Sequence, residues 1–295
     1  MRIISRSEIA ALFPARRADS NKGDYGRVLI IAGSKGMAGA AVLSARAALK
    51  AGAGLVTLAI PEGSQPVAAV CVPEAVMLPL PETKTGEVSR AALKTIAAWK
   101  KKRGLDLFLI GPGLGASSET AEFVRGALAV LDRPFVMDAD ALNCAAQRGD
   151  LRKFFGKAAP HVLTPHPGEI SRLLKIPVPV TKAERISAIK KLCASTGGAV
   201  ILKGSASLVS DGKTIVENPT GGPALAKAGT GDVLAGLLAG YWAQFGKARG
   251  FGMATAYEAA KAAAYIHGLS GDHAAKALGE RSVLAGELLS YLPRF

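Results

Sequence analysis

Apolar residues in the first half of the chain come in short runs that alternate with stretches of helical spacing. Runs of strand length cover residues 27–32, 55–60, 107–110, 134–137 and 161–164, and helical stretches cover 38–50, 118–131 and the region around Glu169. Strands that alternate with helices pair in parallel and are joined by right-handed crossovers. The pattern therefore predicts an α/β fold built on a mostly parallel sheet.

The pattern changes in the last third of the chain. Three short apolar runs follow one another there, at residues 199–203, 207–210 and 214–216. Asp211 and Gly212 mark a tight turn between the last two, so we expect an antiparallel hairpin at one edge of the sheet. Apolar residues at helical spacing then predict three further helices, at residues 233–241, 254–269 and 283–292.

Composition is that of a globular chain. The 295 residues are 49% hydrophobic, 20% charged and only 5% aromatic, which excludes a disordered chain and favours a core of aliphatic residues between closely packed layers. No internal repeat and no Ser/Gly linker divides the sequence. We therefore expect a single domain over residues 1–295, with residues 1–20 as a lead-in.

The sequence also argues against membrane and secreted classes. No apolar run approaches the roughly 20 residues that a membrane span needs, and no apolar segment accompanies the N-terminal arginines, as a secretory signal requires. Cys71, Cys144 and Cys193 have no metal-ligand spacing, so we expect them to be reduced core residues. The expected location is the cytoplasm, with no membrane partner.

A net charge of +14 raises the question of a nucleic-acid partner. The basic residues are dispersed, and their longest run, residues 100–103, has no interleaved aromatic residue. We therefore expect a solvated basic surface and no nucleic-acid partner. Positive potential of this kind accelerates the capture of phosphorylated small molecules.

Two glycine-rich turns follow predicted strands at the same edge of the sheet. Residues 33–39 open a helix, so their backbone N–H groups suit an anion. A dinucleotide fold, with Glu62 ending the next strand, is one interpretation, although the glycines are spaced GxxGxxG and not GxGxxG. A turn that needs glycine only for its backbone geometry is another. With a second such turn at 111–115, the pair favours a crevice for a phosphorylated substrate.

The segment Gly229-Thr230-Gly231-Asp232 directly precedes an apolar helix. Successive N–H groups of small residues at a helix N-terminus stabilise the negative charge that develops on a transferred phosphoryl group. Asp232 lies in the first helical turn, where it can accept a proton from an attacking hydroxyl. The alternative is that Asp232 only complements the helix dipole.

Other polar residues end strands at this edge. His166 could hydrogen-bond a substrate and Glu169 could position Mg²⁺, directly or through water, or Glu169 could merely cap a helix. Asp138 and Asp140, with Asn143, are either helix-capping or functional residues. The loop from Lys203 to Ser207 suits a nucleotide phosphate or ribose. The remaining histidines, which have no ligand spacing, are predicted to be structural or surface residues: His161, His267 and His273.

Together these segments resemble the ribokinase-like superfamily, in which a GxGD anion hole and its Asp activate a hydroxyl toward the terminal phosphate of a nucleotide. Within it, the chain resembles the ADP- or ATP-dependent NAD(P)H-hydrate dehydratases. The matching segments span nearly the whole chain: KGDYGRVLIIAGSKGMAGAA (22–41), GPGLG (111–115), DADALN (138–143), TPHPGE (164–169), LKGSAS (202–207), NPTG (218–221) and AGTGDVLAG (228–236). GTGD alone indicates the superfamily, whereas TPHPGE with KGDYG and GSKGMAGAA indicates the family.

The resemblance implies a ribokinase-like three-layer α/β/α fold and an activity that repairs nicotinamide cofactors. In such enzymes the ring hydroxyl of hydrated NADH or NADPH (the S epimer) is phosphorylated by the nucleotide, and phosphate then leaves. The net reaction is that of a lyase, and ADP as co-substrate would give AMP and phosphate. ADP, or ATP, and Mg²⁺ are therefore the expected co-substrate and cofactor.

The resemblance also implies roles for individual residues. Asp232 would be the base, and Gly229, Thr230 and Gly231 would form the anion hole. Nucleotide contacts would come from Lys203, Gly204, Ser205, Ala206, Ser207 and Gly231, and contacts to the hydrate from Ala40, Gly113, His166 and Asp232. Many family members carry Asn after NPTG, whereas Gly222 stands here.

Partners and rival functions follow from the same resemblance. Family members are commonly tetramers and act together with an epimerase. Only residues 1–21 precede KGDYG, so we expect no fused epimerase domain and a functional pairing with a separate epimerase. One rival is a small-molecule kinase of the superfamily, acting on a thiazole or pyrimidine alcohol and leaving a stable phosphate ester. A nucleotide-binding protein without turnover is the other.

Overall fold

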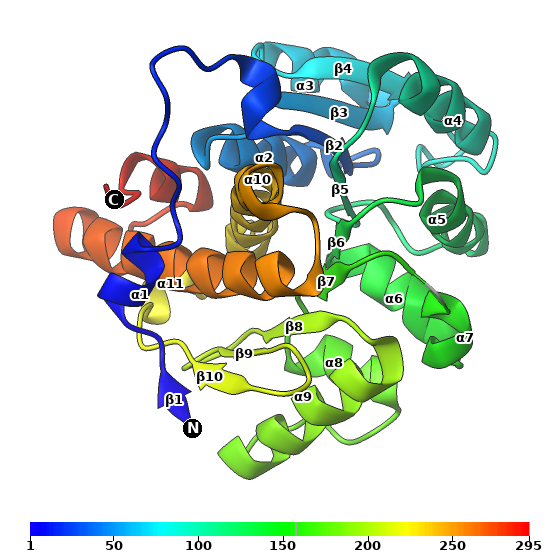
Figure 1. The fold of residues 1–295 in the computed structure, drawn as a ribbon. Helices are drawn as coiled ribbons and strands as arrows, with labels where there is room; N and C mark the ends of the chain where they lie inside the picture. Colours follow the sequence, from blue (N-terminus) through cyan, green and yellow to red (C-terminus); the bar gives the residue numbers. More distant parts are fainter. Residues whose placement is uncertain (157, 295) are drawn as a thin grey trace.

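The predicted alternation builds one sheet between two layers of helices. The computed structural model describes residues 1–156 and 158–294, and in them ten strands form a single sheet in the order β1-β10-β9-β8-β7-β6-β5-β2-β3-β4 (Figure 1). The strands are β1 (Arg2–Ile3), β2 (Arg27–Ile31), β3 (Leu55–Pro61), β4 (Val76–Leu80), β5 (Leu107–Ile110), β6 (Phe135–Met137), β7 (His161–Leu163), β8 (Ala199–Leu202), β9 (Leu208–Ser210) and β10 (Ile215–Glu217). All neighbours pair in parallel except β9, which is antiparallel to β8 and β10.

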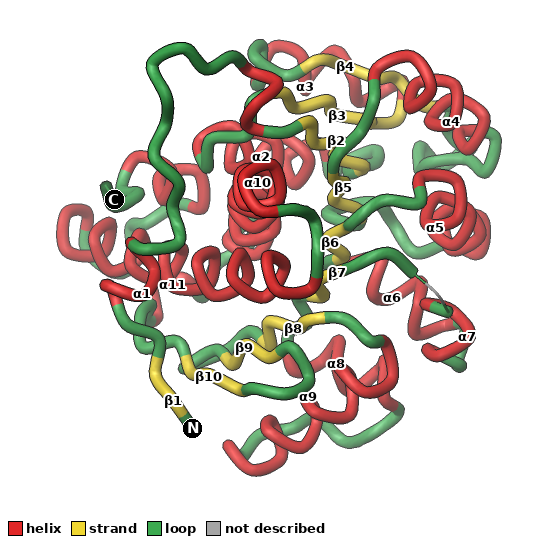
Figure 2. Tube along the Cα trace, viewed as in Figure 1, coloured by secondary structure: helices red, strands yellow, loops and turns green. Residues whose placement is uncertain are grey.

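Helices cover both faces of this sheet (Figure 2). They are α1 (Arg6–Ala10), α2 (Ala38–Lys50), α3 (Gln65–Cys71), α4 (Ala92–Arg103), α5 (Ser118–Leu131), α6 (Ala139–Gln147), α7 (Leu151–Phe155), α8 (Pro167–Leu174), α9 (Lys182–Thr196), α10 (Thr230–Arg249) and α11 (Met253–Leu278). The described part of the chain also contains four short 3₁₀ helices: η1 (Lys22–Tyr25), η2 (Glu62–Ser64), η3 (Pro223–Leu225) and η4 (Ala285–Ser290).

The period-2 direction of side chains in β2 shows how the two layers arise. Val28 and Ile30 face one apolar core, which α2, α10 and α11 complete. Leu29 and Ile31 face the other, which α4, α5, α6, α8 and α9 complete. Because every second residue of a strand points to the same side, a strand that is apolar throughout must be covered on both faces. The expected three-layer α/β/α fold is therefore confirmed.

Most predicted elements are confirmed, and the differences have physical causes. The antiparallel hairpin is present, but β1 from the N-terminal lead-in pairs in parallel with β10 and covers the sheet edge. Strand β4 was not predicted from the sequence patterns. It is a partly exposed edge strand that contains Pro79, a residue that edge strands tolerate. The helix expected at 283–292 is the 3₁₀ helix η4.

The cysteines are free thiols, and two of them are buried. The prediction of a core position is wrong for Cys71, which is exposed. It is the last residue of the short helix α3, whose buried residue is Ala68. Within the described residues, no helix is long and apolar enough to cross a membrane.

Candidate functional site

The two glycine-rich turns meet where the strand order reverses. β2 and β5 are neighbours, with β3 and β4 on one side and β6 to β8 on the other. The helices that follow them, α2 and α5, pack on opposite faces of the sheet. The turns are joined by hydrogen bonds from the Gly33 N–H to the Pro112 carbonyl (2.8 Å) and from the Ser34 hydroxyl to the Gly113 carbonyl (2.8 Å). They form one structural unit at the topological switch point.

Two expected substrate contacts lie together in this unit. A Cβ on Gly113 would come within 3.0 Å of the Cβ of Ala40, which lies in the first turn of α2. Gly33 has φ +83 in the first turn and Gly113 has φ +60 in the second, so both turns use backbone conformations that favour glycine. Because a Cβ on Gly113 would also come within 3.0 Å of Met37, only glycine fits at this position without a shift of its neighbours.

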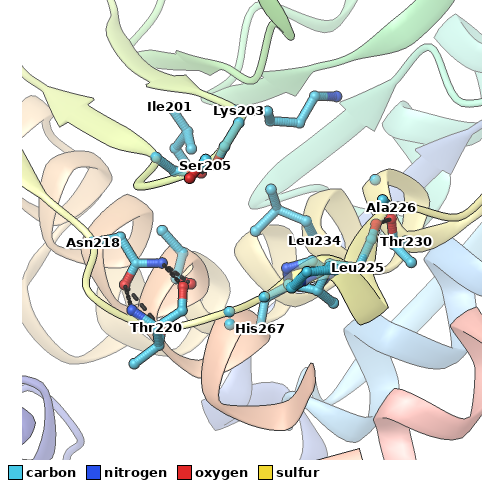
Figure 3. Close-up of a pocket in the computed structure, with 18 residues that line it drawn as sticks. Ile201, Lys203, Ser205, Asn218, Thr220, Leu225, Ala226, Thr230, Leu234 and His267 are labelled. Atoms are coloured by element: carbon cyan, nitrogen blue, oxygen red, sulfur yellow. Dashed lines mark hydrogen bonds between the residues drawn. The ribbon is translucent and has the colours of Figure 1, made fainter. Parts of the chain in front are cut away.

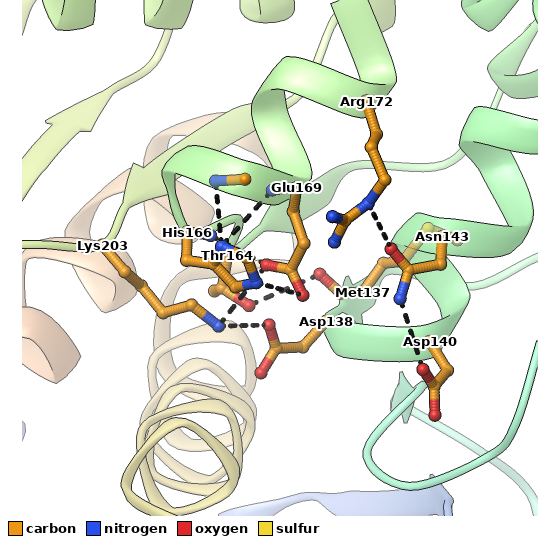
Figure 4. A network of polar contacts seen from close by, with 10 residues as sticks. Met137, Asp138, Asp140, Asn143, Thr164, His166, Glu169, Arg172 and Lys203 are labelled. Atoms are coloured by element: carbon orange, nitrogen blue, oxygen red, sulfur yellow. Dashed lines mark hydrogen bonds and ion pairs between the residues drawn. The ribbon is translucent and has the colours of Figure 1, made fainter. Parts of the chain in front are cut away.

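A network of buried charges occupies the next strands along the same edge (Figure 4). Asp138 follows β6, and its Oδ1 accepts a hydrogen bond from Nζ of Lys203 at 2.8 Å. The same ammonium lies 3.8 Å from Oε2 of Glu169. Burial alone would lower the pKa of Lys203, but the charges of these two carboxylates and of Asp232 hold that pKa above its ordinary value. Lys203 is therefore a cation that neutralises carboxylates, besides its place in the predicted nucleotide loop.

The backbone beside Asp138 is strained. Asp138 is the N-cap of α6 but makes no capping hydrogen bond, and the next residue, Ala139, has φ +50. A non-glycine residue in the left-handed region costs free energy, and such strain collects at functional sites. Of the two interpretations of Asp138, the structure excludes side-chain capping of α6.

Asp232 lies at the start of α10, beside this network. Gly229 is the N-cap with φ +90, and Thr230 donates its hydroxyl hydrogen bond to the carbonyls of Leu225 and Lys227, both at 2.9 Å. A Cβ on Gly231 would lie 3.5 Å from Nζ of Lys203. The GTGD segment and the Lys203 ammonium therefore face the same space.

Burial is the main cause of an unusual pKa at Asp232. It raises the pKa of the carboxyl to about 6, the charge of Asp138 adds to the increase, and Lys203 opposes it. A general base works best when its pKa lies close to the working pH. Asp232 is thus ionised at neutral pH and still basic enough to take a proton.

His166 and Glu169 form a capping box at the start of α8. Nδ1 of His166 accepts from the N–H groups of Gly168 (3.0 Å) and Glu169 (3.3 Å), and Oε2 of Glu169 accepts from the His166 N–H (2.8 Å). The capping interpretation of Glu169 is therefore part of its role. Burial, with Asp138 adding to it, raises the pKa of the Glu169 carboxyl. Burial also lowers the pKa of His166. Because Nδ1 accepts both hydrogen bonds, the ring proton lies on Nε2, which is 3.5 Å from Oε1 of Glu169.

The described residues contain no group of three or more His, Cys, Asp or Glu side chains that could hold a metal ion. Magnesium usually keeps several waters and takes one or two protein carboxylates together with substrate phosphates. Glu169, with Asp138 beside Lys203, supplies hard oxygen ligands of that kind. The residues present fit a magnesium ion that binds together with a nucleotide.

A cavity of about 380 Å³ opens beside the Lys203 to Ser207 loop (Figure 3). Arg185 of α9 supports this loop, since its guanidinium donates to the carbonyls of Ser205 (2.6 Å) and Ala206 (3.2 Å). Ala206 has φ +50. The cavity is lined by Ile201, Lys203, Gly204, Ser205, Ser207, Asn218, Thr220, Gly221, Gly222, Pro223, Leu225, Ala226, Thr230, Gly231, Leu234, Ala264, His267 and Gly268.

The NPTG segment forms the opposite wall and is fixed to α11. Nδ2 of Asn218 donates to the Ala264 carbonyl (3.0 Å), the Thr220 hydroxyl donates to the Tyr265 carbonyl (2.7 Å), and Asp272 accepts from the Gly221 N–H (3.0 Å). A Cβ at Gly222 would have 3.9 Å to its nearest neighbour, so a larger residue fits at this position.

The structure brings most of the predicted site residues to one edge of the sheet, but sequence reasoning missed several neighbours. Arg185 has no motif around it and reaches the loop only through tertiary packing. His267 was expected to be structural, and it is buried, yet it also lines the cavity. Asn218 was recognised only as part of the NPTG motif, with no role of its own. A polar residue directly after β10 was the available signal for Asn218.

This sheet order, with a helix that starts at a GxGD segment over a nucleotide-sized cavity, is that of the ribokinase-like superfamily. Within that class, the chain belongs to the NAD(P)H-hydrate dehydratase family, whose model matches residues 28–294.

Individual relatives agree with this assignment. The chain is 41% identical over 294 residues to a bifunctional NAD(P)H-hydrate repair enzyme of Moorella thermoacetica, covering 99% of this chain and 53% of that protein. It is 34% identical to the ADP-dependent (S)-NAD(P)H-hydrate dehydratase of Neisseria meningitidis, covering 94% of this chain and 87% of that protein. The chain thus spans about half the length of the bifunctional relatives.

A solved structure matches the whole fold. The ADP/ATP-dependent NAD(P)H-hydrate dehydratase of Bacillus subtilis, crystallised with ATP and Mg²⁺, has a TM-score of 0.82 at 29% identity, covering 99% of this chain and 96% of that chain.

Proposed function

We propose that this chain uses ADP to dehydrate the S epimer of hydrated NADH or NADPH, restoring NAD(P)H and releasing AMP and phosphate. The family assignment and the named activities of the relatives support the proposal. The observation that carries it is the Asp232 carboxylate: its pKa is about 6, and it lies at a helix start beside the Lys203 ammonium. This is the environment that transfer of a phosphoryl group to a hydroxyl requires.

Asp232 would accept the proton of the ring hydroxyl as that oxygen attacks the terminal phosphorus of the nucleotide. The bond between this phosphorus and the bridging oxygen breaks, and AMP leaves when the donor is ADP. Gly229, Thr230 and Gly231 present N–H groups at the positive end of α10, where charge on the transferred group is stabilised. Loss of phosphate and of one ring proton then restores the double bond.

Nucleotide and hydrate would approach from two sides of Asp232. The 380 Å³ cavity beside Lys203, Gly204, Ser205, Ala206 and Ser207 suits the nucleotide. The switch-point turns, with Ala40 and Gly113, suit the hydrated ring, and the Nε2–H of His166, 3.5 Å from Oε1 of Glu169, would donate to a substrate oxygen.

Glu169 would hold Mg²⁺, directly or through water. When bound, the ion would offset the charge of the nucleotide phosphates. Lys203 remains the protein's own cation at this point. Its ammonium keeps Asp138 and Glu169 in place in the absence of the ion.

The rival kinase and non-catalytic functions are not favoured by the relatives, whose named activity is the dehydration. A separate epimerase partner, a homotetramer and a cytoplasmic location stay predictions. The relatives include an ADP-dependent and an ADP/ATP-dependent enzyme, so the test below uses both nucleotides.

The direct test mixes the protein with hydrated NADH or NADPH and with ADP or ATP, and follows the dihydronicotinamide absorbance. We expect the absorbance to return in step with AMP when ADP is used. A stable phosphorylated hydrate would point to a kinase. No reaction with either nucleotide, from protein that binds AMP, would refute the proposal.

A further inference from the structure

A series of hydrogen bonds connects the switch-point turns with α8, and Figure 4 shows three of its members, Asp140, Asn143 and Arg172. Oδ2 of Asp140 accepts from the Gly115 N–H at 3.0 Å, and Oδ1 of Asp140 accepts from Nδ2 of Asn143 at 3.3 Å. Oδ1 of Asn143 then accepts from Nε of Arg172 at 3.0 Å. The predicted function uses none of these three side chains.

Arg172 is the residue of this hydrogen-bond series that has unused N–H donors. In residues 1–156 and 158–294 its guanidinium makes the one hydrogen bond through Nε and no ion pair, so both terminal nitrogens are available. Arg172 is exposed, and Figure 4 shows it between Glu169 and Asn143. The Asn143 bond fixes the plane of the guanidinium before any ligand arrives.

The guanidinium also lies beside the expected substrate contacts. A Cβ on Gly168, two residues after His166, would be 3.6 Å from Nη1 of Arg172. The charge of Arg172 reaches the ring of His166 and contributes to lowering its pKa. At its other end, the chain of bonds holds Gly115, two residues from Gly113. Arg172 is therefore tied to both sides of the hydrate site and is separate from the cavity assigned to the nucleotide.

The chemistry of this position favours a phosphate. The other cation of the network, Lys203, is already paired with the carboxylates of Asp138 and Glu169. An anionic dinucleotide needs a free cation there, and a planar guanidinium with two open N–H positions matches phosphate oxygens in a bidentate way.

We propose that Arg172 binds a phosphate group of the nicotinamide dinucleotide and so selects the substrate. This inference rests on the proposed function for the identity of the substrate. Two phosphates have the required chemistry: the pyrophosphate, which NADH and NADPH share, and the 2′-phosphate, which only NADPH carries. Arg172 contacts the dinucleotide itself, whereas Asn143 acts through it as a positioning residue.

Binding of the reaction products tests this without turnover. NADH and NADPH are titrated by dihydronicotinamide fluorescence, with saturating AMP present so that the dinucleotide cannot occupy the nucleotide cavity. Arg172→Gln should weaken binding roughly 10- to 100-fold, the usual loss for a charge-assisted hydrogen bond to phosphate. Arg148→Gln, at the exposed C-terminal end of α6, is the matched control and should bind as the wild type does.

A comparison of the loss of NADH binding with the loss of NADPH binding shows which phosphate Arg172 contacts. Equal losses for NADH and NADPH assign Arg172 to the pyrophosphate, and a loss confined to NADPH assigns it to the 2′-phosphate. Unchanged binding of both cofactors to Arg172→Gln, or no binding of either to the wild type, overturns the inference. Asn143→Leu, which keeps the guanidinium but frees it, should give a smaller loss of the same pattern.

Turnover separates this inference from the proposed function. With hydrated substrate, Arg172→Gln should raise KM while kcat stays within about threefold, because a contact made equally in ground and transition states is lost. If the wild type turns over no hydrate but Arg172→Gln still weakens cofactor binding, the proposed function fails and the phosphate site remains. A fall in kcat at unchanged KM would contradict a binding role.

Discussion

The interface between α2 and α10 and the charged network above the sheet are both buried, but they are built in opposite ways. α2 and α10 meet through small residues: a Cβ on Gly236 would overlap the carbonyl oxygen of Ser44, and one on Gly240 would crowd that of Ala48. The network instead packs Asp138, Glu169 and Lys203 into the interior. The helix interface is packed so closely that no further atoms fit, whereas the network brings charged groups together.

Both regions include part of α10, so one helix contributes to stability through its packed face and to function through its first turn. Close apolar packing contributes dispersion and hydrophobic free energy with no polar group left to satisfy. Buried charges cost desolvation, and their attraction offsets this cost only when the geometry is good. Because Asp232 lies one turn before Gly236 on α10, the helix carries the costly charge at one end while tight packing holds it in place.

The largest effect on turnover is expected at Asp232, whose charge takes part in the proposed reaction. Asp232→Asn keeps the shape of the side chain but cannot accept a proton, so turnover should fall by about 10² to 10⁴. The free energy of unfolding should fall by no more than about 1 kcal/mol, because the lost N-terminal helix charge is offset by removal of a carboxylate that burial and Asp138 disfavour. Steady-state rates and thermal unfolding check the two parts.

Glu122→Gln is the control for this prediction, because it removes an exposed carboxylate that pairs with Arg90 at 3.5 Å on the surface. It should leave rate and stability unchanged. Near-normal turnover by Asp232→Asn would remove Asp232 from the mechanism.

A second prediction breaks the packed interface instead. Gly236→Leu places a side chain where the Ser44 carbonyl stands, and overpacking should lower the free energy of unfolding by about 3 kcal/mol. Urea unfolding followed by circular dichroism measures the change. Gly39→Ala, also in a helix but with no neighbour within 4 Å of the new Cβ, should be neutral or slightly stabilising. A stable Gly236→Leu variant would show that α2 and α10 are less closely packed than described.

The two regions were not equally predictable from the sequence. Apolar spacing gave α2 and α5 with their observed bounds, because covered helices must place small and aliphatic residues on the sheet side. The strands were predicted from short apolar runs, which a sheet that is covered on both faces requires. The period of the side chains therefore located most of the strands, but it did not predict the helices α1, α3, α4, α6, α7 and α9.

The site was predictable only in part. Motifs named Asp232 and the Lys203 loop, but they did not reveal that Lys203 pairs with Asp138, 65 residues earlier. Such pairs depend on which strand ends lie side by side, and so does the support that Arg185 gives to the loop. Positive φ at Ala139 is likewise visible only in the backbone.

A third prediction concerns pH and the network. Asp232 must be ionised to act, and its pKa is about 6, so kcat/KM should be constant above that pH and fall about tenfold for each unit below it. Asp138→Asn removes one charge that raises this pKa, which should move the fall to lower pH. Burial is the larger cause and remains, so the pKa should stay above the ordinary value for Asp.

The pH dependence of kcat/KM in both proteins checks this, with the exposed Asp19→Asn as a control that should keep the wild-type profile. A shift to higher pH in Asp138→Asn would contradict the assigned coupling.

The smallest effect is expected at the residue that joins the two regions. Ser44 is fully buried in α2, and its hydroxyl donates to the main-chain carbonyl of Asp232 at 3.2 Å. Ser44→Ala removes this hydrogen bond, but the carbonyl lies in the first turn of α10 and keeps its bonding position in the helix. The free energy of unfolding should fall by about 1 kcal/mol, the usual net value of such a bond. Because packing at Gly236 still fixes the helix, turnover should change by less than about threefold, as steady-state rates on the purified variant will show. A loss comparable to that of Asp232→Asn would mean that the Ser44 hydroxyl, and not the packed interface, holds the carboxylate in its working position.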